Sequence, residues 1–125
     1  MGLSRSDALS IGRGVGAEAV QGVVLVSDTS PIEIIAGRTG QTLFLNHIEI
    51  SWTDITSNGV LSLTDGSGGT AFWQVEFYSN PSYQPRAYSI QLGEYGFALT
   101  EGNGIFGSTE SSNTDFTILA LGCWR

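Results

Sequence analysis

Lysine is absent from this chain, and histidine and cysteine occur once each, as His47 and Cys123. The lack of lysine excludes Schiff-base chemistry and a P-loop lysine. One histidine is too few for the ligand cluster of a cupin-type metal enzyme, and no G-x-S-x-G elbow accompanies it. One cysteine excludes an intrachain disulfide. Cys123 lies in an apolar, strand-like stretch, so we expect a buried hydrophobe there and not a reactive thiol. The sequence therefore predicts a protein without catalytic residues, metal site or cofactor, and not an enzyme.

Long apolar runs and helical periodicity are also missing. No run approaches the ~20 residues that cross a bilayer, and the N-terminus has no apolar core of a secretory signal. No window of helical length places apolar residues at i, i+3, i+4 and i+7. We expect one soluble domain, made in the cytoplasm, in which any helix is a single turn.

Positive charge is scarce. Twelve acidic residues stand against five arginines, which gives a net charge of −7. Such a surface repels phosphate backbones and anionic lipid headgroups. Neither nucleic acid nor a membrane is therefore expected as a partner.

From residue 20 onward the chain consists of short runs rich in β-branched and aromatic residues, separated by glycine-bearing turns. The clearest alternation places Ile48, Ile50 and Trp52 on one face of a strand, and the strongest turn is 65–69. We predict strands at 20–27, 31–36, 41–52, 59–64, 70–78, 86–92, 97–100 and 115–122. About eight antiparallel strands favour an all-β, two-sheet sandwich of jelly-roll type, with an immunoglobulin-type sandwich as the alternative fold.

Residues 1–19 differ from the rest, because glycine occupies every second position between Ile11 and Gly16. Glycine is unfavourable in a helix, whereas the alternation suits an extended segment lying along another surface. We predict an extended N-terminal arm at 1–19 and a sandwich domain at 20–125. The arm would dock through four apolar anchors: Leu3, Leu9, Ile11 and Val15.

The aromatic residues have two interpretations. At alternating strand positions, or at the end of the chain, large aromatic residues usually fill a core or a subunit interface; this is the role expected for Trp52, Trp73, Phe77 and Trp124. Exposed rings near the loop 81–85 could instead face a ligand such as a glycan, and the candidates are Tyr78, Tyr83 and Tyr88.

Three segments carry a resemblance to a known family: the hairpin 59–71, the Gly-Asn-Gly-Ile step within 101–105 and the strand 116–122. In this succession the chain resembles the small jelly-roll-like proteins that decorate or cement the capsids of tailed bacteriophages, or cap their head fibres. It departs from them in the bulky pair Phe72 and Trp73 and in the loop 81–85. The resemblance implies a homotrimer on the capsid exterior, made in the host cytoplasm, whose arm contacts the major capsid protein.

Two other functions remain open at this point. The same fold could serve as a carbohydrate-binding or receptor-binding knob on a phage fibre, with glycan contacts made by the exposed tyrosines. A glycan-active enzyme would need two cooperating carboxylates among the twelve acidic residues, most of which lie beside Gly, Ser, Thr or Asn in predicted turns. The turn 65–68 lacks the repeated acidic residues of a calcium-binding loop.

Overall fold

The computed structural model describes residues 18–27, 29–52, 55, 57–78, 87–110 and 115–125. The strands of this part of the chain are β1 (Glu18–Val26), β2 (Ile32–Ile35), β3 (Leu43–Ser51), β4 (Gly59–Asp65), β5 (Ala71–Phe77), β6 (Ala87–Gln91), β7 (Phe97–Ala98), β8 (Ile105–Thr109) and β9 (Phe116–Trp124). Within it, no helix has the length and apolar character needed to cross a membrane.

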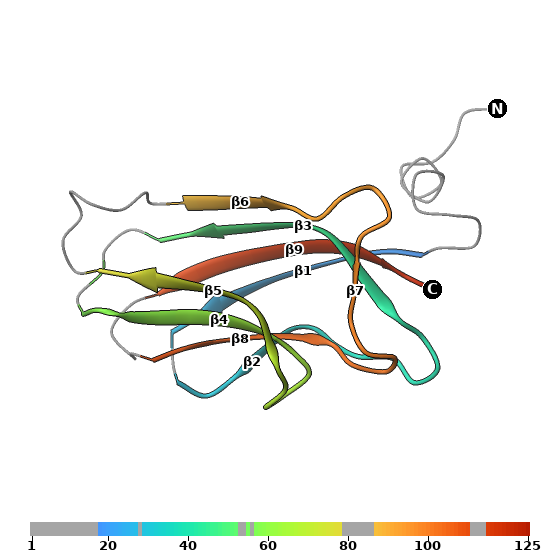
Figure 1. The fold of residues 1–125 in the computed structure, drawn as a ribbon, viewed down its shortest axis with the longest axis horizontal. Coiled ribbons are helices and arrows are strands. Elements are labelled where there is room, and N and C mark those ends of the chain that lie inside the picture. The colour runs from blue at the N-terminus through green and yellow to red at the C-terminus, as the bar shows by residue number, and fades with distance from the viewer. Residues whose placement is uncertain (1–17, 28, 53–54, 56, 79–86, 111–114) are drawn as a thin grey trace.

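The strands form two stacked antiparallel sheets (Figure 1). Sheet A has the order β1-β9-β3-β6, with the short β7 paired to β3, and sheet B has the order β2-β8-β4-β5. Apart from β7, the chain passes between the sheets at every step except β4 to β5, which form a hairpin. This is the strand order of a jelly roll, so the predicted all-β, two-sheet sandwich is confirmed.

The eight strands expected from the sequence each overlap one observed strand, but the expected number is one too small. The sequence analysis missed β8 because Gly107 interrupts a run of only five residues, close behind two other glycines. Packing explains that glycine, since a Cβ at position 107 would lie 3.1 Å from Cγ2 of Val26. Backbone pairing with β4 and β2 holds this segment as a strand despite its weak propensity.

The core lies between the sheets and is built by the alternation seen in the sequence. Ile48 and Ile50 of β3 are fully buried, and Trp52 beyond the strand is 7% exposed. His47 and Glu49 lie on the opposite face of the same strand, where their side chains pair at 3.0 Å. The bulge between Leu45 and His47 is what keeps both halves of β3 in phase with the core.

At one side the two sheets approach closely, because β1 and β2 meet at Gly22. A Cβ at this position would lie 2.0 Å from the carbonyl oxygen of Ile34, so any larger residue would push the sheets apart. The opposite side, between β5 and β6, is filled by aromatic rings: Tyr88 contacts Trp52 at 5.5 Å and Trp73 at 5.9 Å between ring centroids.

Asp65, at the start of the predicted turn, ties the β4–β5 hairpin to the segment before β8. Its carboxylate accepts hydrogen bonds from the backbone N–H and hydroxyl of Thr100, at 2.9 and 2.8 Å, and from the amide of Asn103 at 3.0 Å. Partial burial acts to raise the pKa of Asp65, but the hydrogen bonds from Thr100 and Asn103 outweigh it, and the net pKa is lowered. The charged form is therefore the one that stabilises the fold.

This network predicts a specific dependence of stability on pH. Because the folded-state pKa of Asp65 is depressed, its contribution is complete above the unfolded-state pKa of about 4 and is lost as the pH falls through the lower folded value. Asp65→Asn should lower the free energy of unfolding at neutral pH by about 1–3 kcal/mol, as measured by urea denaturation. The deficit should shrink below about pH 4, while the exposed control Glu94→Gln should match the wild type. A deficit that stays constant down to about pH 2 would contradict this role.

Candidate assembly surface

The outer face of sheet A carries apolar residues on β1 and β9. The register places Val23 opposite Leu119, Leu25 opposite Thr117 and Gln21 opposite Leu121. Val23 and Leu25 are 60% and 53% exposed, and Leu119 and Leu121 beside them are half-buried. We call this group, Val23, Leu25, Leu119 and Leu121, the apolar stripe.

The sequence of these strands explains the stripe. The stretches 23–26 and 118–121 are uninterrupted apolar runs, Val-Val-Leu-Val and Ile-Leu-Ala-Leu, and such runs are typical of strands covered on both faces. In the structure the core covers only the inner face of these runs. Val26, Ile118 and Ala120 are buried, whereas Val23, Leu25, Leu119 and Leu121 point outward. The stripe is thus an apolar face without a second layer among the described residues.

The outward positions of β1 and β9 also carry no charge. They are Ala19, Gln21, Val23, Leu25, Thr117, Leu119 and Leu121, while Cys123 has the same register but is buried. In a chain with a net charge of −7, uncharged positions along these two strands reduce the repulsion of another acidic protein, and Glu49 of β3, opposite Leu119, is the acidic residue beside them.

The outer face of sheet B has a different character. Residues that lie side by side across β5, β4 and the β8 end form two rows on this face. One row is Glu76, Val60 and Glu110, and the next is Gln74, Ser62 and Ser108; Glu33 of β2 lies on the same face. The Gln74 amide donates to the Ser62 hydroxyl at 3.0 Å. This polar and acidic face needs no protein layer over it.

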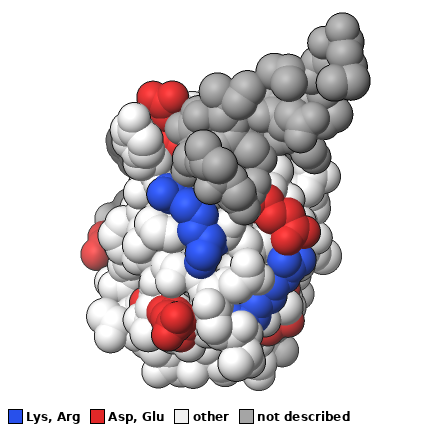
Figure 2. All heavy atoms as spheres, turned by 90° about the vertical axis from the view of Figure 1, so that its right-hand side faces the viewer, with Lys and Arg blue, Asp and Glu red and all other residues white. Residues whose placement is uncertain are grey.

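The end of the sandwich where β1 begins and β9 ends holds both arginines of the described residues. Arg38 pairs with Glu18 at 2.7 Å and lies 5.0 Å from the Trp124 ring centroid, while Arg125 lies 4.0 Å from that of Phe44. The hydrogen bond and charge of Arg38 lower the pKa of Glu18. Among the described residues, basic and acidic side chains are interspersed over this end (Figure 2).

The aromatic residues singled out in the sequence lie mostly inside the sandwich. Phe77 and Trp124 are buried and Trp52 almost so, while Trp73 packs against the core from its margin. Trp124, the penultimate residue, is 1% exposed, so it does not need a neighbouring subunit to cover it. Phe77 and Trp52 both contact Phe116, at 5.0 and 5.4 Å between ring centroids.

The three tyrosines proposed to face a ligand differ in their surroundings. Tyr78 is 44% exposed, whereas Tyr88 packs inward against Trp52 and Trp73. Tyr83 lies outside the described residues, as do the expected arm anchors Leu3, Leu9, Ile11 and Val15. Cys123 is a free, buried cysteine, as predicted.

The residues of the apolar stripe, which form the candidate assembly surface, were not identified from the sequence. Val23, Leu25, Leu119 and Leu121 stand out only when the register of β1 and β9 is known, although their uninterrupted apolar runs are a signal that the sequence does contain. Within the described residues, no three His, Cys, Asp or Glu side chains gather into a group that could hold a metal ion.

A comparison with solved structures shows an architectural likeness. No family model matches the chain, and no curated protein matches it. A solved structure described as "Bacillus endospore appendages form a novel family of disulfide-linked pili" is similar over 90% of this chain and 91% of that chain, with 13% sequence identity and a TM-score of 0.44. That likeness concerns a β-rich fold and is too distant to carry a functional assignment.

Proposed function

We propose that this protein is a structural subunit that acts by assembly and not by catalysis. The observation that carries the proposal is the apolar stripe, an uncharged group on an acidic molecule, which the described residues cover on the inner side of β1 and β9 only. Apolar patches of roughly 300–600 Å² occur on monomeric proteins and are often functional, and we assign this one to an interface between chains.

The occupant proposed for the stripe is a second copy of the chain. An acidic copy is repelled by Glu33, Glu76 and Glu110 on sheet B, whereas the outward positions of β1 and β9 carry no charge and Glu49, opposite Leu119 on β3, is the acidic residue beside them. A basic partner would prefer the opposite face. Self-association through the stripe is therefore the arrangement that the charge distribution favours.

In its finer form, the proposal is a homotrimer that decorates or cements the capsid of a tailed bacteriophage from the outside. The strand order of a jelly roll, the acidic outer surface and the segment resemblance described above are consistent with this role. The major capsid protein would be the second partner, reached by the N-terminal arm.

The apolar stripe alone is smaller than a stable interface, and the N-terminal arm is proposed to supply the remaining contact area. Two strands of nine residues are roughly 30 Å long and together roughly 10 Å wide, or about 300 Å² of face per copy. A stable interface buries about 800 Å² on each partner. Residues 1–17, which immediately precede β1, hold two of the five arginines and only one of the twelve acidic residues, so they can add contact area with little repulsion.

Replacing the stripe should abolish self-association without unfolding the domain. The wild type is expected at about 40 kDa by light scattering, three chains of 13.3 kDa. The double variant Val23→Ser with Leu119→Ser should sediment and scatter as a monomer, because it removes apolar area from the interface only. Tyr95→Ser removes a residue of 68% exposure outside the stripe and should remain trimeric.

The same strand supplies a second control. Val26→Ser changes a fully buried residue three positions from Val23 and should destabilise the fold itself by about 2–4 kcal/mol. A wild-type chain that stays monomeric at micromolar concentration, or a stripe variant that remains a trimer, would refute the proposed interface.

Deleting residues 1–17 tests the proposed role of the arm, since the cut leaves β1 complete. The truncated domain should keep its β-sheet circular dichroism and bind capsid shells with at least tenfold lower occupancy in a co-sedimentation assay. Leu9→Ser with Ile11→Ser in the full chain should give a smaller loss in the same direction. Unchanged occupancy after the deletion would remove the arm from the mechanism.

A further inference from the structure

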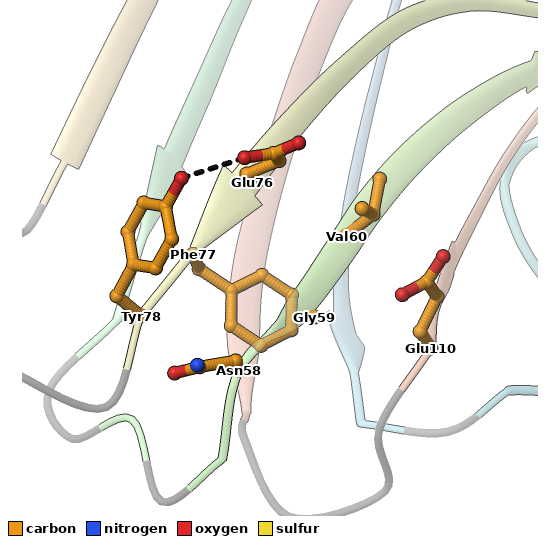
Figure 3. A pocket seen from close by; sticks show the side chains of 7 residues that line it. All are labelled: Asn58, Gly59, Val60, Glu76, Phe77, Tyr78 and Glu110. Carbon is orange, nitrogen blue, oxygen red and sulfur yellow. Dashed lines mark hydrogen bonds between the residues drawn. The ribbon is translucent and has the colours of Figure 1, made fainter.

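A pocket of about 270 Å³ opens on the outer face of sheet B, at the end of the sandwich where β5 and β8 finish and β4 begins (Figure 3). Its floor is Val60 of β4. On one side of Val60 lies Glu76, directly opposite it in the β4–β5 ladder. On the other side lies Glu110, whose backbone N–H donates to the Val60 carbonyl at 3.0 Å. The two carboxylate residues therefore flank an apolar floor at about two strand spacings, roughly 10 Å.

Tyr78 forms the wall next to Glu76. Its hydroxyl donates to Glu76 Oε2 at 2.6 Å, and Tyr78 as a whole is 44% exposed (Figure 3). This hydrogen bond and the charge of Glu76 raise the pKa of Tyr78, so the phenol stays protonated and holds the carboxylate in place. The pocket thus has one oriented acceptor before any ligand arrives.

The polar lining selects the kind of ligand. Glu76 and Glu110 provide only acceptors when ionised, and the Asn58 amide provides both a donor and an acceptor. No cationic side chain lines the described part of the pocket, so phosphate, sulfate and carboxylate groups are repelled. Ligands that bring hydroxyl or amino donors are favoured.

The volume and the lining of the pocket narrow the choice of ligand further. A volume of about 270 Å³ is below the usual range of roughly 300–1,000 Å³ for cofactor and drug-sized ligands. An exposed phenol ring beside an apolar floor suits a small ligand with one apolar face and polar edges. Charge alone would hold a lysine or arginine side chain weakly here, because exposed ion pairs contribute only about 0–1 kcal/mol.

We propose that this pocket binds one sugar residue of a neutral or amino-bearing saccharide, with hydroxyl or amino groups donating to Glu76 and Glu110 and the sugar ring against Tyr78 and Val60. The site lies on sheet B, and the apolar stripe lies on sheet A. Saccharide binding therefore goes beyond the proposed assembly role and does not depend on it. If the chain also assembles through sheet A, each copy keeps its pocket open, and several weak sites act together on one glycan-bearing surface.

The test uses the full chain and a panel of soluble oligosaccharides, measured by ligand-observed NMR and then by calorimetry. The panel contains neutral hexose and N-acetylhexosamine oligomers, their de-N-acetylated amino forms, and sialylated or sulfated counterparts. At least one neutral or amino oligosaccharide should bind, and adding sialic acid or sulfate to the same core should weaken its binding about tenfold or more.

Substitutions of the pocket residues test whether the saccharide binds at this site. Tyr78→Ala and Glu76→Gln should each weaken binding about tenfold, since each removes a contact group or the charge of an acceptor. Tyr78→Phe keeps the ring and loses only the hydrogen bond to Glu76, so its effect should be smaller. Glu110→Gln tests the opposite wall. The matched control is Glu33→Gln, an exposed carboxylate on the same face of sheet B outside the pocket, which should bind like the wild type.

The outcomes separate this site from the assembly proposal. The stripe variant Val23→Ser with Leu119→Ser should retain the affinity per chain even as a monomer. The proposed site is refuted if no saccharide of the panel binds, or if binding is unchanged in folded Tyr78→Ala and Glu76→Gln chains. It is also refuted if the pocket variants lose binding of an arginine-rich peptide while no saccharide binds at all.

Discussion

The double pairing of β9 is the constraint on which the rest of the structure depends. This last strand lies between β1 and β3 and forms a ladder with each, so the first and last described strands of the chain are neighbours in sheet A. Sheet A therefore cannot be completed until the whole chain is available, and its contacts are long-range ones of the kind that make β-sandwiches fold slowly. The same ladders fix which residues of β1 and β9 face outward, and so they create the apolar stripe.

The two sheets use their outer faces in opposite ways. In β3 from His47 onward and in β5 from Trp73 onward, polar residues alternate with core residues, as in Glu49 between Ile48 and Ile50, so water can cover the outer face there. On β1 and β9 apolar residues occupy both faces, although the described residues cover only the inner one. A sequence that needed only a monomeric sandwich would gain solubility from polar residues at Val23 and Leu25, and the exposure of these two side chains is the physical argument for a partner.

Much of the architecture could be predicted from the sequence, because it depends on local signals. The alternation around Ile48 and Trp52 gave the correct inward face of β3, and glycines 66 and 68 do adopt the positive φ values that the predicted hairpin turn needs. The features that the sequence analysis missed depend on contacts between residues far apart in the sequence. β8 has weak propensity and exists because β4 and β2 pair with it, and the flanking of Val60 by Glu76 and Glu110 depends on the register of three strands. Neither relationship leaves a periodic pattern along the chain.

Charge placement links the two proposed surfaces. Glutamates on the outer face of sheet B discourage another acidic copy from docking there, which directs association toward the uncharged strip of β1 and β9 by repulsion elsewhere as well as by apolar contact. The same glutamates give the pocket its preference for ligands with hydroxyl or amino donors. Because Tyr78 satisfies one oxygen of Glu76 and keeps that side chain oriented, a feature that prevents wrong assembly can also serve recognition. One set of acidic residues would then determine both where copies meet and what the opposite face can bind.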